Sequence, residues 1–173
     1  MAISGRNSSS SPNLQNIPQD KAYRKPFIAG YGKKLTIADY SAQEIRILAY
    51  LSQDPTLISI IESKKDLHCE IARLAFGEII TKKGNPERRN QIKALIFGLA
   101  YGLSPDGFAR NNEVTLEIAK EMYDKFFDTF TGVKEWYDKT KYTRSEFMRT
   151  ILGRKIWLHP YSYTRNTLAL NRT

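Results

Sequence analysis

Residues 88–102 read Arg88-Arg89-Asn90-Gln91-Ile92-Lys93-Ala94-Leu95-Ile96-Phe97-Gly98-Leu99-Ala100-Tyr101-Gly102. At 3.6 residues per turn, side chains four positions apart lie along one helix face. The stripe that this spacing selects is Arg89, Lys93, Phe97 and Tyr101. The opposite face is apolar and can pack on a scaffold; it carries Ile92, Leu95, Ile96 and Leu99. Cations suit phosphate oxygens and rings suit a sugar or base, so the stripe could clamp a nucleotide. Spacing alone favours a simpler interpretation, an amphipathic helix with a solvated charged end.

Both ends of this helix are marked in the sequence. Asn85 suits the N-cap, Pro86 suits the first helical position, and Gly102 suits the stop, which predicts a helix over 86–101. Similar patterns predict further helices at 43–51, 56–62, 67–76, 116–130 and 133–142. The apolar stripe of 116–130 is typical of a core-facing helix.

The composition favours a polyanionic partner. Lys and Arg number 27 against 18 acidic residues, a formal net charge of +9 in 173 residues. Nucleic acid is the simplest such partner, with an anionic membrane surface as the weaker option. The single Cys69 excludes an internal disulfide. No signal-peptide pattern and no apolar run of membrane-spanning length occur, so we expect a cytoplasmic protein with no membrane partner.

A strand followed by a helix is predicted around Asp39. Residues 35–41 are rich in β-branched side chains and follow a Gly-Tyr-Gly turn, and Ser41 with Glu44 has the form of a capping box. Asp39 would then end a strand just before a helix, where catalytic carboxylates occur, although a lone Asp there is also a common turn former. Glu44 could likewise be only the capping partner of Ser41.

His68 falls in the first turn of the helix predicted over 67–76, after the cap residue Asp66. An isolated His in that place is usually a surface residue. No Cys or His stands at ligand spacing from it, so we expect no metal site there.

Both ends of the chain differ from its helical centre. Residues 1–18 are rich in Ser, Asn and Pro, which indicates a flexible loop or tail, or a loop whose Arg6 and amides contact a nucleic-acid backbone. Residues 147–151 and 155–158 flank Leu152-Gly153-Arg154, which predicts a hairpin with Arg154 at its tip. Residues 163–171 have the pattern of another helix. The order of elements indicates an α+β fold with its helices in 56–142.

Taken together and in order, five stretches resemble the A-family (DNA polymerase I-like) DNA polymerases. Gly5-Arg6, Ser8-Ser9 and Pro12-Asn13-Leu14-Gln15-Asn16-Ile17-Pro18 are similar to that family's template- and primer-contacting loop. Asp39-Tyr40-Ser41 with Glu44 and Arg46 resembles its first palm motif. Residues 89–102 resemble the fingers helix, Gly153-Arg154 the hairpin after the fingers, and Ala169-Leu170-Asn171 the start of a later palm helix.

The resemblance implies a right-hand polymerase fold. It is an α+β fold in which a mostly helical fingers block, 56–145, is inserted between partial palm segments at 1–55 and 146–173. The implied activity is template-directed DNA synthesis, with primer–template DNA, a dNTP and the remainder of the polymerase as partners. The implied location is the cytoplasm of a bacterium or of a virus-infected cell.

The same resemblance implies a role for each site residue. Asp39, with the Tyr40 carbonyl, would bind two catalytic Mg²⁺ ions. Arg89 and Lys93 would act in catalysis by holding the β- and γ-phosphates. The other residues implied at the nucleotide are Tyr40, Ser41, Glu44, His68, Phe97 and Tyr101, with Glu44 excluding a ribonucleotide 2′-hydroxyl. The resemblance also implies that an enzyme with Phe at position 97, in contrast to one with Tyr there, discriminates against dideoxynucleotides. The residues implied at DNA are Arg6, Asn13, Gln15, Asn16, Tyr101, Gly102, Arg154 and Asn171.

Two departures from the family pattern limit these expectations. Residues 42–43 are Ala-Gln where the family has Gln-Ile, so no template contact is expected of Gln43. The family's His-Asp-Glu triplet, which supplies a second metal-binding carboxylate, does not occur, so we expect an internal fragment that is inactive alone. A non-catalytic basic DNA-binding module and a single-subunit RNA polymerase relative are the alternatives. Asp39 argues against the first because it would repel a phosphate backbone, and Glu44 argues against the second.

Overall fold

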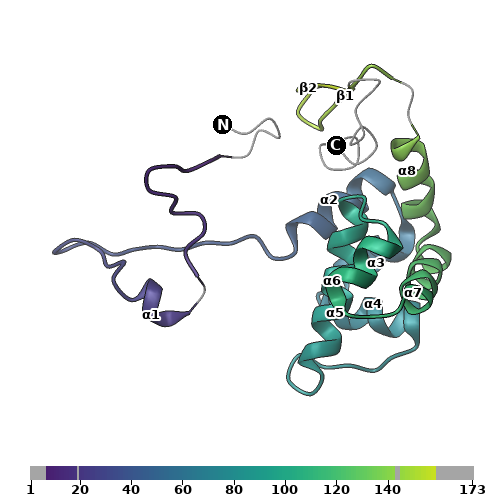
Figure 1. Ribbon diagram of the computed structural model, residues 1–173, viewed down its shortest axis with the longest axis horizontal. Helices are drawn as coiled ribbons and strands as arrows, with labels where there is room; N and C mark the ends of the chain where they lie inside the picture. Colours follow the sequence, from purple (N-terminus) through teal and green to yellow (C-terminus); the bar gives the residue numbers. More distant parts are fainter. Residues whose placement is uncertain (1–6, 19, 143–144, 159–173) are drawn as a thin grey trace. The chain divides into compact units, whose positions relative to one another are not determined.

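A computed structural model describes residues 7–18, 20–142 and 145–158 of the chain (Figure 1). Contacts divide the chain into two compact units, Met1–Ser41 and Ala42–Thr173. The described part of the first unit has one short helix, α1 (Lys21–Arg24). In the second unit the described elements, in chain order, are α2 (Gln43–Ser52), α3 (Pro55–Glu62), α4 (Leu67–Phe76), α5 (Pro86–Ala100), α6 (Pro105–Asn112), α7 (Leu116–Thr129), α8 (Thr131–Lys141), β1 (Phe147–Arg149) and β2 (Lys155–Trp157). The described chain is therefore mostly helical, with one small sheet.

The strand predicted over 35–41 is wrong. Residues 33–40 have no regular secondary structure and all are exposed. A β-branched run becomes a strand only when a neighbouring strand takes its backbone hydrogen bonds, and the ladder found in the described residues joins β1 to β2 alone. The turn before this run forms as expected, with the Lys33 N–H donating to the Gly30 carbonyl at 3.0 Å.

Helix α2 begins as predicted, but the capping box does not form. The N-cap residue is Ala42, whose backbone is left-handed (φ 49°) and whose side chain makes no cap hydrogen bond. A capping box needs its Ser at the N-cap with an extended backbone. The left-handed Ala42 takes that position from Ser41.

Helix α5 begins and ends close to the predicted bounds. Pro86 is its first residue, although the Asn85 side chain accepts from the Thr81 N–H instead of capping the helix. Gly102 (φ 72°) ends it, because the Leu103 N–H returns to the Gly98 carbonyl at 2.7 Å in a Schellman motif. A Cβ on Gly98 would lie 2.9 Å from Leu103 Cδ2, so a side chain at 98 would displace the Leu103 side chain.

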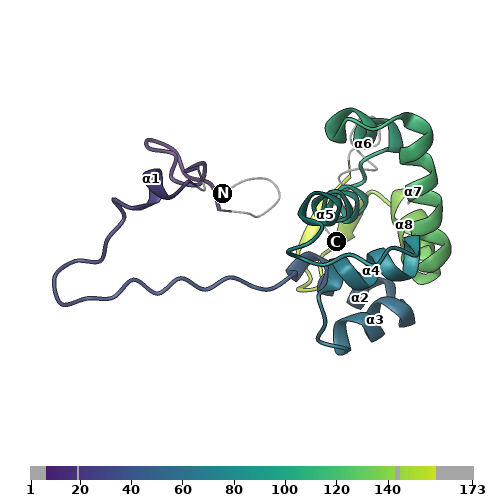
Figure 2. The same cartoon turned by 90° about the horizontal axis from the view of Figure 1, so that it is seen from below.

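The apolar face of α5 is buried, as predicted. Its four side chains are at most 2 % exposed: Ile92, Leu95, Ile96 and Leu99. They pack among helices α2, α4 and α6, and Figure 2 shows α5 flanked by α4 and α6. Because this face of α5 packs against the other helices, Lys93 and Phe97 lie on the exposed side of the helix. Burial of one face thus decides where the polar and aromatic stripe points.

One buried carboxylate ties two distant helices together. Asp54 is 1 % exposed and caps α3, accepting from the Leu57 N–H at 2.8 Å. Its second oxygen accepts from the N–H groups of Gly132 (2.9 Å) and Val133 (3.4 Å) at the start of α8. A Cβ on Gly132 would lie 2.9 Å from Asp54 Cα, so this approach depends on glycine.

Helix α7 supplies much of the remaining core. The stripe predicted there is buried at Ala119, Met122, Tyr123, Phe126 and Phe130, whereas Leu116 is 36 % exposed. Thr115 caps the helix as predicted, accepting from the Ile118 N–H. The helix ends at Thr129, and α8 starts two residues later without an intervening glycine turn.

The predicted hairpin is confirmed. Strands β1 and β2 are antiparallel, and the turn is closed by the Gly153 N–H donating to the Thr150 carbonyl at 2.8 Å. Gly153 has φ 82°, and Arg154 beside it is exposed. None of the helices in the described ranges is long and apolar enough to cross a membrane. The predictions for Arg6, Asn171 and the helix over 163–171 lie outside the described residues.

Candidate functional site

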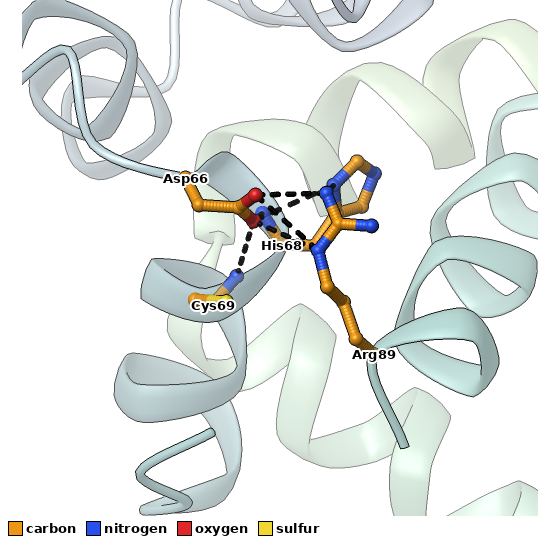
Figure 3. Close-up of polar contacts among 4 residues, drawn as sticks. All are labelled: Asp66, His68, Cys69 and Arg89. Atoms are coloured by element: carbon orange, nitrogen blue, oxygen red, sulfur yellow. Dashed lines mark hydrogen bonds and ion pairs between the residues drawn. The ribbon is translucent and has the colours of Figure 1, made fainter. Parts of the chain in front are cut away.

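Arg89, in the first turns of α5, is held by a residue from another helix. Its Nη2 donates to Asp66 Oδ2 at 2.8 Å, and its Nε lies 3.2 Å and 3.3 Å from the two Asp66 oxygens (Figure 3). Asp66 in turn caps α4, accepting from the N–H groups of His68 and Cys69 at 3.1 Å each. One carboxylate therefore joins the start of α4 to the start of α5.

The pKa of Asp66 reflects these bonds. Partial burial works to raise it, but the hydrogen bonds from Arg89 and from the Cys69 backbone outweigh burial and lower the pKa from 3.8 to about 2. Asp66 is therefore ionised throughout the physiological range, and it keeps the Arg89 ion pair intact.

His68 is more buried than predicted. Its side chain is 12 % exposed, because the ring lies against Arg89, whose Nη2 is 3.3 Å from His68 Nδ1. Burial is the largest cause of a lowered pKa at His68; the charges of Arg89 and Lys93 lower it further, and Asp66 opposes them. The ring is therefore neutral at pH 7, able to donate one hydrogen bond.

The rest of the stripe lies farther along α5. Lys93 is exposed and forms no ion pair or hydrogen bond with a described residue. The rings of Phe97 and Tyr101 stack, with centroids 5.6 Å apart and planes at 27°. Phe97 is 37 % exposed. Cations and a neutral His at one end can bind phosphate oxygens, and stacked rings at the other end can bind a base or sugar.

The profile of DNA polymerase family A matches residues 1–172 of this chain. The chain belongs to this family. It is 40% identical over 170 residues to DNA polymerase I of Caldicellulosiruptor bescii, covering 95% of this chain and 20% of that relative. To DNA polymerase I of Pseudomonas aeruginosa it is 36% identical over 172 residues, covering 96% of this chain and 19% of the relative. The chain thus spans about a fifth of the length of the curated relatives that it matches.

A family A structure also resembles this one. It is the POL domain of Pol1 from M. smegmatis, in complex with DNA primer-template and dNTP. The TM-score is 0.82 at 34% identity, and the match covers 99% of this chain and 32% of that structure. Family membership is therefore confirmed. Of the α+β fold predicted from the sequence, the mostly helical character is confirmed, and the arrangement of fingers between palm segments stays a prediction.

The structure describes the burial and position of other residues expected at a family A site. Glu44 is half-buried in the first turn of α2, and α2 packs against α5. Asp39, Tyr40 and Ser41 belong to the first unit, where each is exposed. Their roles stay predictions.

The metal prediction concerns Asp39 and the Tyr40 carbonyl. Mg²⁺ takes six oxygen ligands and is usually held through one or two carboxylates, with waters and substrate phosphates completing the set. The described residues contain no group of three or more His, Cys, Asp or Glu side chains that could hold a metal by themselves. The Asp39 carboxylate is exposed, and a carboxylate and a backbone carbonyl are both oxygen donors that Mg²⁺ accepts, so the two residues fit as a partial ligand set.

Residues expected at DNA also have ordinary local roles. Asn13 Oδ1 accepts from the Gln15 N–H at 3.1 Å, and Gln15 Nε2 donates to the Asn7 carbonyl at 2.8 Å, so the loop is held by its own side chains. Asn16 and Arg154 are exposed. DNA contacts by these residues, and by Tyr101 and Gly102, stay predictions.

Sequence reasoning missed what Asp66 does. The sequence pattern predicts Asp66 only as the cap residue of the helix over 67–76, and no pattern pairs Asp66 with Arg89. The cap pattern places the carboxylate beside the first turn of α4, which explains the bond to His68. Nothing in the pattern brings a cation 23 residues away to the same carboxylate.

Proposed function

We propose that this chain supplies the incoming-nucleotide site and part of the catalytic palm of a family A DNA polymerase. The reaction is the transfer of a nucleotidyl group from a dNTP to a primer 3′-hydroxyl, directed by a template. The observation that carries the proposal is the stripe of α5, in which Lys93 and Phe97 are exposed and Arg89 and Tyr101 are half-buried, while the opposite face of the helix is buried. A helix with a buried back can hold these groups in fixed positions.

In this proposal each end of the stripe binds one part of the nucleotide. Arg89, Lys93 and the neutral His68 donate hydrogen bonds to the triphosphate, and the two cations offset the charge that grows on the pyrophosphate leaving group. Phe97 stacks against the sugar and base, and Tyr101 lines the pocket at the templating base.

The other proposed roles belong to Glu44 and to residues 39–41. Glu44 would lie under the sugar C2′, where a ribonucleotide hydroxyl has no room. Tyr40 and Ser41 would also bind the nucleotide. Asp39 and the Tyr40 carbonyl would hold Mg²⁺. The metal would activate the primer hydroxyl and stabilise the leaving group.

The proposed division of the chain follows the right-hand polymerase plan. Residues 56–145 would form the fingers, and residues 1–55 and 146–173 would form parts of the palm. Primer–template DNA would contact the N-terminal loop at Arg6, Asn13, Gln15 and Asn16. Elsewhere in the chain it would contact Tyr101, Gly102, Arg154 and Asn171. These groups read the backbone and shape of a duplex and not its sequence. The thumb and the remaining palm would come from the rest of the polymerase, in the cytoplasm.

A chimaera tests this proposal. The matched segment of the Caldicellulosiruptor bescii polymerase would be replaced by this chain, and single-nucleotide primer extension would be measured. We expect the chimaera to incorporate dNTPs, and Asp39→Ala to abolish incorporation. A chimaera that folds but extends no primer would contradict the proposed function, and retained activity in Asp39→Ala would contradict the catalytic role of that carboxylate. Glu44→Ala serves as a specificity test, because it should admit ribonucleotides.

A further inference from the structure

The hydrogen bonds of Arg89 leave one edge of its guanidinium free. A guanidinium has five N–H groups, on Nε, Nη1 and Nη2. The Nε group donates to Asp66, and Nη2 donates to Asp66 and contacts His68 Nδ1. None of the hydrogen bonds to Asp66 and His68 uses Nη1, which lies on the side of the guanidinium away from Asp66 and Cys69 (Figure 3). The carboxylate thus fixes which edge of Arg89 is available to a ligand.

The same contact selects one form of His68. Arginine has no acceptor and is not deprotonated in proteins, so Nη2 can only donate to His68 Nδ1. Nδ1 must therefore present its lone pair, and the proton of the neutral ring must be on Nε2. The His68 side chain is 12 % exposed and the His68 backbone N–H donates to Asp66, so the ring has little freedom to turn.

We propose that Asp66 is a positioning residue of the triphosphate site. By holding one edge of Arg89 and capping the helix that carries His68, it presents Arg89 Nη1 and His68 Nε2–H as two fixed donors to the phosphates. This inference rests on the proposed function for the identity of the ligand. Asp66 itself touches no phosphate, and it acts through the two side chains that do.

Two simpler roles for Asp66 predict different behaviour. If Asp66 were only a helix cap, Asp66→Asn would leave triphosphate binding unchanged, because Asn caps as well as Asp. If Asp66 competed with the ligand for Arg89, the same substitution would strengthen binding. If Asp66 positions Arg89, we expect weaker triphosphate binding in Asp66→Asn. The Asn N–H₂ group would face the Arg89 N–H groups, and the Arg89 side chain would no longer be held in one orientation.

The size of the effect follows from the freedom that Arg89 would regain. Ordering a free arginine side chain weakens binding by up to about 30-fold. Removal of the Asp66 charge offsets part of this, because that charge repels phosphate. We therefore expect Asp66→Asn to weaken triphosphate binding by about 5- to 30-fold.

The experiment titrates the full 173-residue chain with inorganic tripolyphosphate and with dATP by calorimetry. The matched control is Glu78→Gln, which removes the comparable ion pair of Arg88 on the same helix and should leave both affinities unchanged. In an Arg89→Lys background, Asp66→Asn should have no further effect if it acts through Arg89. Additive losses in that background, or equal or tighter binding by Asp66→Asn alone, would overturn the proposal.

A second measurement does not depend on ligand binding. The ¹⁵N shifts of the His68 ring at pH 7 should show the Nε2–H tautomer in the wild type and a mixture of tautomers in Asp66→Asn. A wild-type chain that binds neither probe contradicts the proposed function, and the tautomer then decides whether Asp66 positions these groups. A proton on Nδ1 in the wild type overturns the inference. If circular dichroism shows that Asp66→Asn is unfolded, Asp66→Ser, which retains an N-cap, takes its place.

Discussion

Replacing Asp54 by Ala should destabilise the chain far more than the loss of an ordinary helix cap. The carboxylate accepts from Leu57 at the start of α3 and from Gly132 and Val133 at the start of α8. Loss of one cap costs about 1 kcal/mol, and the site is 1 % exposed, so water cannot replace the lost acceptor. A buried N–H left without an acceptor costs about 1–3 kcal/mol. We expect Asp54→Ala to lower the free energy of unfolding by about 2–4 kcal/mol.

Urea unfolding followed by circular dichroism at 222 nm measures this loss. The matched control is Thr115→Ala, which removes a single exposed cap from α7 and should cost about 0.5–1 kcal/mol. Gly132→Ala tests the same junction from the other side, because its new Cβ would meet the Asp54 backbone. If Asp54→Ala lost no more than Thr115→Ala, the account of one carboxylate holding two helices would be refuted.

Three further predictions concern the site. Lys93→Ala should weaken dATP binding by about 10- to 150-fold, since a charged hydrogen bond contributes about 1.5–3 kcal/mol. The urea midpoint of this variant should not change, because Lys93 is exposed and unpaired among the described residues. Unchanged dATP affinity in calorimetry would contradict the role of Lys93. Phe97→Tyr in the chimaera should incorporate dideoxynucleotides more readily than the parent, measured as the ratio of terminated to extended primers; an equal ratio would contradict the implied discrimination. The pKa of Asp66 is lowered from 3.8 to about 2, so its contribution to stability is complete above pH 4 and is lost as pH falls toward 2. Between pH 4 and 2, the free energy of unfolding should therefore depend less on pH in Asp66→Asn than in the wild type. Identical pH profiles of the two chains would contradict the lowered pKa of Asp66.

The bounds of α5 could be predicted because their causes are local. Pro86 begins the helix and Gly102 ends it through properties of their own backbones, and neighbours in sequence satisfy the bonds involved. The buried face of α5 was equally predictable, since it follows from the helical period. The aromatic pair of Phe97 and Tyr101 follows from the same period.

What could not be predicted depends on contacts between distant parts of the chain. The Arg89 ion pair joins residues 23 apart, and the Asp54 bond to Gly132 joins residues 78 apart. His68 is buried because Arg89 lies against it, which no pattern within α4 records. The strand expected at 35–41 failed for a related reason, because β-propensity forms a strand only where a partner strand is present.

The most direct test of the nucleotide site is a titration of the ¹⁵N-labelled chain with dATP, followed through its backbone amide shifts. We expect the largest changes in residues 89–101 and at His68. We also expect Lys93→Ala to reduce these changes at every one of these positions. Changes spread over the lysines of α7 and α8, or unaltered by Lys93→Ala, would show that dATP is attracted by net charge alone and would contradict the central claim.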